Sequence, residues 1–244
     1  MGTVREFRLA SDVGGQSGVF LVAVHPSGFE PMLATARRQL EGDAWAYDAK
    51  VDGWRAVAHV GASCVAVYSR PGRDITASLP GLQALADVVP EGTVLDGEVV
   101  AGSGGASSFY RLATLMATSP ARRPAEVSFV AFDVLALDGD RRTASPYRER
   151  RRLLEGLALS GPAWCTSRCW TEVAVGDLLT ACEGLDVEGV VAKRLDESPY
   201  RPGQRSRDWV KIKTPAWRVE HGPFRHDHDR GARAGGGGAE GTVA

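Results

Sequence analysis

The chain has no long hydrophobic run, because none of its 244 residues lies in a stretch approaching the roughly 18 apolar residues of a membrane-spanning helix. Its first residues also lack the apolar core of a secretory signal. Cysteine is scarce, with Cys64, Cys165, Cys169 and Cys182 scattered and no second pair at zinc-binding spacing. We therefore expect reduced thiols in a cytoplasmic protein, and no membrane partner.

Net charge is also nearly absent, since 29 Lys and Arg residues face 30 Asp and Glu residues, a formal charge of -1. A polyanion such as DNA must therefore be met by a local basic patch, because the overall field does not attract it. With 43% hydrophobic residues, the chain can bury the core of one large domain or two small ones.

What is present is a β-rich pattern from residue 45 onward. Two apolar runs joined by Gly-Ala-Ser predict a hairpin over 55–69. Ser145 as N-cap and Pro146 as the first helical residue predict a helix over 145–159. Strands and helices are mixed without regular βαβ alternation, which favours an α+β fold. Further strands are expected at 18–24, 92–101, 127–139, 189–195 and 208–213, and further helices at 79–89 and 176–184.

Three regions are expected along the chain. An N-terminal extension covers 1–29, one folded domain covers 30–217, and a Gly-rich tail covers 218–244. The tail has no apolar period, so we predict that it is disordered. Its His-Asp-His-Asp run at 226–229 could hold a metal adventitiously, but a disordered tail is the favoured interpretation.

A lysine stands beside an apolar strand in the stretch K-x-D-G-x-R, formed by Lys50, Asp52, Gly53 and Arg55. The plain alternative is a strand lysine that reaches the surface, followed by an Asp-Gly turn. Taken alone, this motif does not decide between the two.

Further charges occur at a period of two on apolar strands. Asp96 and Glu98 face the same side of one strand, and Lys211 and Lys213 face the same side of another. Glu188 stands at the start of a third apolar strand. Each motif has a structural alternative in a turn or a solvated face, but their number favours a shared site.

In this order, K-x-D-G-x-R, SRPGRD, DGE, FD, EGVVAK and K-x-K resemble the motifs of covalent nucleotidyltransferases, which include ATP-dependent DNA ligases, RNA ligases and capping enzymes. The stretches 30–35, 69–76 and 198–213 are similar to the adenylation domain of bacterial ATP-dependent DNA ligases of the end-joining repair type. The resemblance implies two antiparallel sheets with flanking helices and an ATP pocket between them. No OB-fold is expected, because the Gly-rich tail cannot supply a five-stranded barrel.

The resemblance implies that Lys50 attacks the α-phosphate of ATP, forms Lys-AMP and releases pyrophosphate. AMP then passes to a DNA 5′-phosphate, and the 3′-hydroxyl seals the strand. A free lysine has a pKa of about 10.4, so burial or nearby positive charge must favour its neutral form. We expect Lys211 and Lys213 to face Lys50 and to neutralise the α-phosphate.

Four nucleotide contacts are carried over from the resemblance. Glu98 is expected to accept a hydrogen bond from a ribose hydroxyl. Phe132 is expected to stack on adenine, with Val190 on the opposite face of the base. Asp48 stands near the adenine amine, at a position where these ligases commonly have Glu, so the adenine contact is expected to be weaker.

The resemblance also implies a metal and phosphate contacts. Glu188 is expected to bind Mg²⁺, which prefers carboxylate oxygen and water. Arg55 and Arg70 are expected to hold phosphates or ribose through the guanidinium fork. DNA phosphates are expected to be held by a Pro/Gly/Ser loop beside the site, whose alternative is a solvated loop. The arginines of this loop are Arg201, Arg205 and Arg207.

Three hypotheses follow. The first is an ATP-dependent DNA ligase adenylation domain acting on nicked or broken double-stranded DNA in a nucleoid-associated cytoplasmic setting, alone or with an OB-fold or end-joining repair protein in trans. The second is a truncated ligase paralogue that binds nucleotide or DNA ends without sealing. The third is an RNA ligase or capping-type enzyme, against which the SPYRPG stretch at 198–203 argues.

Overall fold

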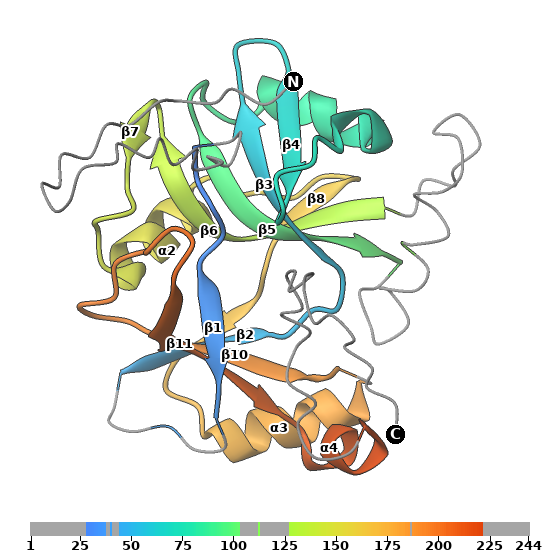
Figure 1. The fold of residues 1–244 in the computed structure, drawn as a ribbon, viewed down its shortest axis with the longest axis vertical. Helices are drawn as coiled ribbons and strands as arrows, with labels where there is room; N and C mark the ends of the chain where they lie inside the picture. Colours follow the sequence, from blue (N-terminus) through green and yellow to red (C-terminus); the bar gives the residue numbers. More distant parts are fainter. Residues whose placement is uncertain are drawn as a thin grey trace, which may run out of the picture.

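Two β-sheets form the framework of the molecule, with helices around them (Figure 1). This architecture confirms the predicted α+β fold of two sheets with flanking helices. The strand predicted at 18–24 lies outside the described residues. The structure is a computed structural model, and it describes residues 28–37, 40, 44–102, 112, 127–185 and 187–221.

The first sheet brings together strands from opposite ends of the chain, in the order β1-β11-β10-β2-β9. Its β1–β11 pair is parallel and the other neighbouring pairs are antiparallel, so the expected antiparallel sheet has one parallel pair at its edge. A parallel pair needs a long crossover, which nearly the whole domain supplies here. The strands are β1 (Leu33–Ala36), β2 (Trp45–Ala49), β9 (Cys169–Trp170), β10 (Gly189–Arg194) and β11 (Arg205–Lys213).

The second sheet has the order β4-β3-β5-β6-β7, and β8 pairs with β6 in parallel. The predicted hairpin is confirmed as the antiparallel β3–β4 pair, with Val60 opposite Val65. Its loop extends to Cys64, because Gly61 N–H donates to the Cys64 carbonyl at 2.8 Å. The strands are β3 (Trp54–Val60), β4 (Val65–Ser69), β5 (Val94–Ala101), β6 (Val127–Leu137), β7 (Asp140–Arg141) and β8 (Trp164–Thr166).

Two predicted helices are present with changed details. Helix α2 is Tyr147–Gly156, and Pro146 precedes it with a ψ of 152°. The prediction of Ser145 as N-cap and Pro146 as the first helical residue was wrong by one position, because proline fixes φ but leaves ψ free to be extended. Helix α3 (Val175–Gly184) confirms the helix predicted at 176–184.

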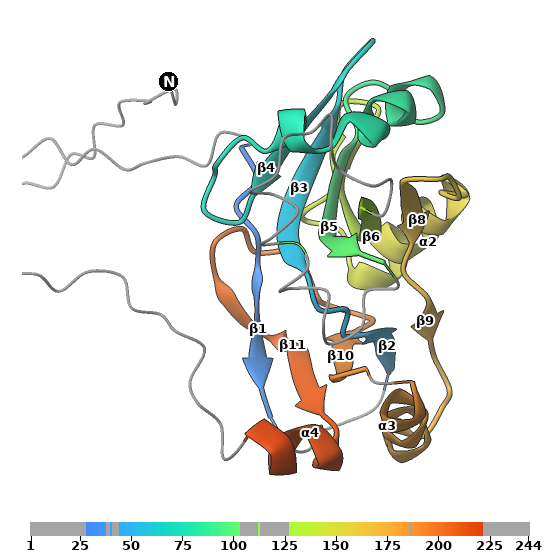
Figure 2. The same ribbon diagram turned by 90° about the vertical axis from the view of Figure 1, so that its right-hand side faces the viewer.

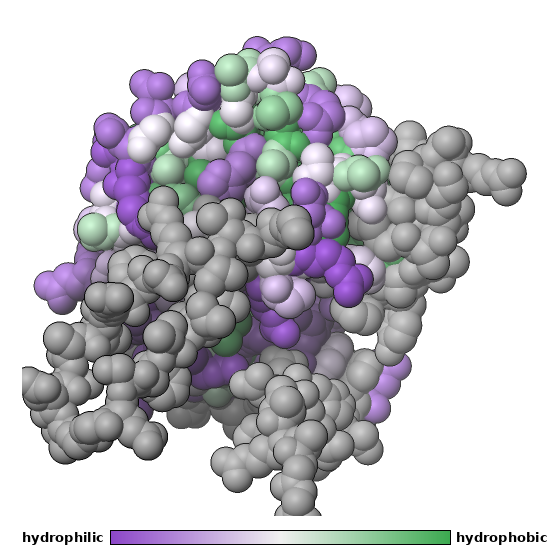
Figure 3. All heavy atoms as spheres, turned by 45° about the horizontal axis from the view of Figure 1, so that its top comes forward, coloured by the Kyte–Doolittle hydropathy of each residue, from purple (hydrophilic) through white to green (hydrophobic). Residues whose placement is uncertain are grey.

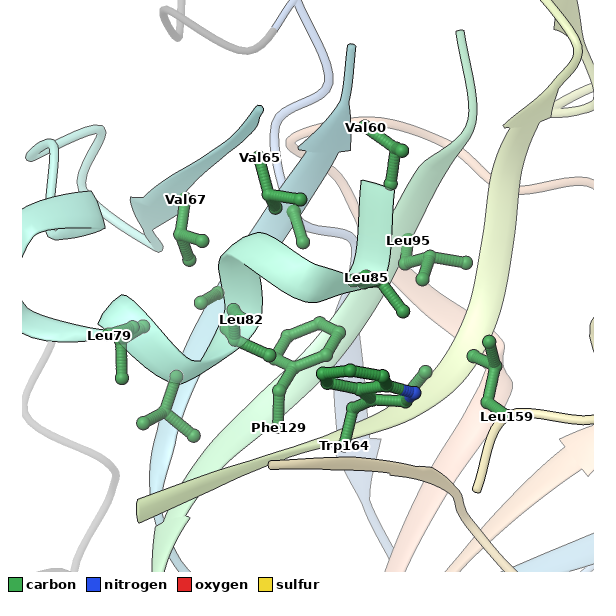
Figure 4. Packing of buried hydrophobic residues seen from close by; sticks show 14 of the residues in the cluster. Val60, Val65, Val67, Leu79, Leu82, Leu85, Leu95, Phe129, Leu159 and Trp164 are labelled. Carbon is green, nitrogen blue, oxygen red and sulfur yellow. The ribbon is translucent and has the colours of Figure 1, made fainter. Parts of the chain in front are cut away.

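The segment predicted as a helix at 79–89 is helical but of the 3₁₀ type. It forms η2 (Pro80–Asp87), preceded by η1 (Thr76–Ser78). Leu82 and Leu85 of η2 point toward Phe129 and Trp164 beneath them, and this packing fills the core of the second sheet (Figure 4).

Helix α4 (Pro215–His221) was not predicted, and it runs past residue 218, where the disordered tail was expected to begin. Thr214 and Pro215 start it, and Trp217 N–H donates to the Thr214 hydroxyl at 3.2 Å. Ala216 N–H also donates to Glu183 Oε1 at 3.0 Å, which ties α4 to α3. The rest of the predicted tail lies outside the described residues.

In the part of the chain that the structure describes, no helix is long and apolar enough to cross a membrane. Figure 3 views the end of the molecule that carries β4 and the 3₁₀ helices, where apolar atoms show between hydrophilic residues.

The chain passes from the first sheet to the second between β2 and β3, as Figures 1 and 2 show. Lys50 lies in this crossing, directly after β2. Gly53, in the same crossing, needs to be glycine, because a Cβ there would lie 2.2 Å from the Val99 carbonyl oxygen. The close approach brings the crossing down onto β5 and places Lys50 between the two sheets.

Candidate nucleotide site

A cavity of about 170 Å³ opens between the two sheets. Both sheets contribute to its walls, which combine aromatic and aliphatic side chains with charged ones. Most of the residues predicted to bind nucleotide lie on it. The lining residues are Leu33, Ala34, Asp48, Ala49, Lys50, Val51, Arg55, Arg70, Glu98, Phe132, Ser167, Val191, Lys193, Trp209 and Lys211.

Lys50 is held at the cavity by Gly189, the first residue of β10, and by Glu188, the residue before that strand. Its N–H donates to the Gly189 carbonyl at 2.8 Å, and its ammonium donates to Glu188 Oε2 in a close ion pair. Burial lowers the pKa of Lys50, but the charge and hydrogen bond of Glu188, with Glu98 and Asp52, outweigh burial and raise it. The expectation that the surroundings favour neutral Lys50 is therefore wrong.

Glu188 connects two lysines. Its Oε2 accepts from Lys50, and its Oε1 lies 2.5 Å from Lys213 Nζ. Burial raises the pKa of Glu188, but the charges and hydrogen bonds of the two lysines outweigh it and lower that pKa. Lys211 lines the cavity, whereas Lys213 packs its ammonium 3.3 Å from the centre of the Trp217 ring.

Glu98 lines the same cavity as Lys50, and its pKa is shifted mainly by burial. Burial raises its pKa to about 7, although the charges of Arg55 and Lys50 lower it in part. Arg55 is itself held from behind, because its Nε and Nη2 donate to the two oxygens of Asp96 at 2.5 Å each. A carboxyl group that titrates near neutral pH therefore lies where the ribose contact was predicted.

Phe132, predicted to stack on adenine, forms one wall of the cavity. The guanidinium carbon of Arg55 lies 4.5 Å from the ring centre, and Lys193 Nζ lies 4.6 Å from it. Val191 lines the cavity and packs in the same cluster as Phe132. Val190 does not line it, because it is fully buried in the cluster that includes Leu178 of α3. The prediction that Val190 faces the base was therefore wrong. Successive side chains of a strand point to opposite faces, so the next residue, Val191, faces the cavity instead.

Asp48 lies in the cavity wall, but its carboxylate is already bound. Its Oδ2 lies 2.5 Å from Lys193 Nζ, and its Oδ1 lies 3.5 Å from Arg151 Nη1. Tyr147 and Ser167 direct their hydroxyls at it at 3.4 and 3.5 Å. The residue expected at the adenine amine is therefore also the anion that balances a buried lysine.

The remaining predicted arginines divide between the cavity and the region of β11. Arg70 lines the cavity, while Arg201 donates to Asp208 Oδ2 at 2.7 Å and Arg205 to the Ala34 carbonyl at 2.6 Å. Arg205 and Arg207 belong to β11, so only Arg201 lies in the predicted loop. Arg207 is exposed.

The residues of this site fit a divalent cation only if phosphate oxygens complete its coordination. Within the described residues, no group of three or more His, Cys, Asp and Glu side chains could hold a metal. Glu188 supplies a carboxylate beside Lys50, and Mg²⁺ is commonly bound through one or two carboxylates together with water and substrate phosphates. The residues present match that pattern.

Two features of the site were not predicted. Trp209 lines the cavity, and its place two residues before Lys211 on β11 was the available signal, because side chains at that spacing share a face. The second feature is the distribution of lysine. The whole sequence has four lysines, and all of them lie at the cavity or on Glu188: Lys50, Lys193, Lys211 and Lys213.

The two facing sheets, with a lysine at a cavity lined by carboxylates and aromatic residues, define a nucleotidyltransferase fold. The family model "ATP dependent DNA ligase domain" matches residues 31–213, and the chain therefore belongs to that family. This confirms the resemblance noted in the sequence.

Solved structures agree. The ligase domain of LigD from M. tuberculosis superposes with a TM-score of 0.63 at 34% identity, over 76% of this chain and 60% of that one. A mycobacterial DNA ligase D complexed with ATP and MES gives a TM-score of 0.62 at 34% identity, over the same shares of the two chains. A Chlorella virus DNA ligase-adenylate, at 18% identity and a TM-score of 0.54, shows the fold alone.

Curated relatives are longer than the matched region. The multifunctional non-homologous end joining DNA repair protein LigD of Mycobacterium tuberculosis is 41% identical over 190 residues, which cover 75% of this chain and 24% of LigD. DNA ligase C1 of Mycolicibacterium smegmatis is 36% identical over 204 residues, 75% of this chain and 56% of that protein.

Proposed function

We propose that this chain uses ATP to adenylate Lys50 and transfers the AMP to the 5′-phosphate of a DNA strand break for repair. The observation that carries this proposal is the cavity between the sheets. It combines a candidate nucleophile, Lys50, with an aromatic wall at Phe132 and an acceptor for ribose at Glu98.

The residues that line the cavity suit the successive steps of this reaction. Phe132 and Val191 offer apolar surfaces for a base, and Lys211 offers positive charge to a phosphate. Lys50 must lose a proton before it attacks, and its ion pair with Glu188 favours the ammonium form. Mg²⁺, when bound with the triphosphate, offsets phosphate charge and gives Glu188 another partner.

The test is incubation of the protein with α-labelled ATP and Mg²⁺, followed by denaturation. We expect a covalent label that Lys50→Ala removes. Lys50→Arg is the matched control, because it keeps a cation beside Glu188 but has no nucleophilic amine. Label retained in Lys50→Ala would exclude Lys50 as the nucleophile. ATP binding without any label would favour the second hypothesis, a ligase paralogue that binds without sealing.

The finer proposals concern partners. LigD is named as a non-homologous end joining DNA repair protein, so we propose nicked or broken double-stranded DNA as the substrate and the nucleoid as the place of action. An OB-fold or end-joining repair protein acting in trans is proposed from the sequence resemblance. Sealing of a nicked duplex with and without such a protein tests it, and equal sealing in both would remove the partner.

A further inference from the structure

Tyr200 is a buried tyrosine that does not line the cavity. It directly precedes Arg201 in the segment between β10 and β11, and it is 2% exposed. Its hydroxyl donates to Asp96 Oδ2 at 2.6 Å and accepts from Met32 N–H at 2.9 Å. One hydroxyl therefore joins the β10–β11 segment, the residue before β1, and β5.

Asp96 extends this contact to Arg55. The Nε and Nη2 of Arg55 donate to the two carboxylate oxygens at 2.5 Å each, which is a bidentate pair. Arg55 Nη2 also donates to the Met32 carbonyl at 3.3 Å. Asp96 is completely buried, so its oxygens depend on such partners for their hydrogen bonds.

Arg55 brings this series of contacts to the nucleotide cavity. Its guanidinium carbon lies 4.5 Å from the centre of the Phe132 ring, and both residues line the cavity. A guanidinium at that distance interacts with the ring face. Its position therefore sets how much of the ring remains open to a stacked base.

We propose that Tyr200 is a positioning residue for the nucleotide site, which acts through Asp96 on Arg55. This inference rests on the proposed function, because it takes ATP as the occupant of the cavity. Arg201 N–H donates to Met32 Sδ at 3.1 Å, so the same network reaches the segment proposed to bind DNA. Tyr200 does not line the cavity, and it reaches Arg55 through Asp96.

Tyr200→Phe tests the role of the hydroxyl alone. The ring stays in its packing against Trp209, with ring centres 5.7 Å apart. We expect the affinity for α,β-methylene-ATP, which cannot adenylate Lys50, to fall about tenfold, the scale of losing a hydrogen bond to a charged group. In the labelling assay, KM for ATP should rise while kcat changes little.

A double-mutant cycle separates positioning from general loosening of the fold. Arg55→Lys keeps a cation beside Asp96 but cannot make the bidentate contact. In that background, Tyr200→Phe should lower affinity by less than about twofold, because the two side chains act as one unit. Tyr147→Phe is the matched control, since it removes another buried tyrosine hydroxyl outside this series and its effect should add to that of Arg55→Lys.

An unchanged affinity in Tyr200→Phe, or an equal loss in both backgrounds, overturns the proposal. If circular dichroism shows that Arg55→Lys does not fold, the cycle is run with Asp96→Asn, which keeps the volume of the side chain. A wild-type protein that binds no α,β-methylene-ATP overturns the proposed function instead, so the two failures are distinguishable.

Discussion

Glu98 shows how strongly a single residue is altered by its place between the sheets. Burial raises its pKa to about 7 from an ordinary value of 4.5, and the nearby cations Arg55 and Lys50 offset only part of that shift. The folded protein therefore binds this proton more tightly than the unfolded chain does. Stability from protonated Glu98 is complete below pH 4.5 and is lost as the pH rises through about 7.

Glu98→Gln should remove this pH dependence. Between pH 5 and pH 8, the free energy of unfolding of the wild type should fall by up to about 3 kcal/mol relative to Glu98→Gln, because each pKa unit corresponds to about 1.4 kcal/mol. Urea denaturation at the two pH values measures it. Glu188 has a lowered pKa, so its contribution changes at lower pH and is common to both proteins. Parallel pH profiles would show that Glu98 does not titrate in this range.

At the scale of elements, successive side chains of strand β10 have different roles, because one packs in the core and the next lines the cavity. Val190 lies opposite Ile212 and packs with α3, whereas Val191 lies opposite Lys211 and lines the cavity. The sequence predicted the strand but not which valine faces the base. Both are valines in a continuous apolar run, so only the partner strands and α3 decide the two faces.

The two valines make a matched pair for mutation. Val190→Ala should lower the free energy of unfolding by about 2 kcal/mol, because it opens a cavity in the core. Val191→Ala should instead weaken ATP binding by about tenfold, because two methyl groups are lost from the base-facing surface. Urea denaturation and calorimetric titration of both variants decide this. The reverse result would place Val190, not Val191, at the base.

Other elements differ in how much local sequence determines them. The β3–β4 hairpin was predictable because its pattern and its turn are adjacent in the chain. Helix α4 was missed because it is short and its start at Thr214 and Pro215 lies next to a Gly-rich stretch. The β1–β11 pair could not be predicted, since its strands stand at opposite ends of the domain.

At the scale of the whole molecule, the first sheet has two opposite edges. β1 forms one edge, with β11 next to it, and β9 forms the other edge; Figure 2 shows β1 and β9 on opposite sides of the molecule. The arginines proposed to bind DNA lie along β11 and the loop before it. The motif residues predicted the cavity well, because the same motif strands form it. They could not predict that Glu188 pairs with both Lys50 and Lys213, which depends on the three side chains meeting in space.

Removing one exposed arginine from β11 should weaken DNA binding in a salt-dependent way. Arg207→Ala should lower affinity for a nicked duplex and reduce the slope of log affinity against log salt by about 1, as expected for one phosphate contact. Fluorescence anisotropy at several salt concentrations measures both. Arg168→Ala, between β8 and β9, is the control with the same loss of charge. Equal effects of the two variants would argue against a DNA surface at β11.

The gathering of every lysine at the nucleotide site has a practical consequence for handling this protein. Amine-reactive dyes, biotin esters and surface-coupling reagents usually modify scattered surface lysines and leave a site untouched. Here the ε-amines available to such reagents are those of the cavity and of Glu188's partners. Labelling or immobilising this protein through lysine therefore targets its nucleotide site, and attachment through an added tag avoids it.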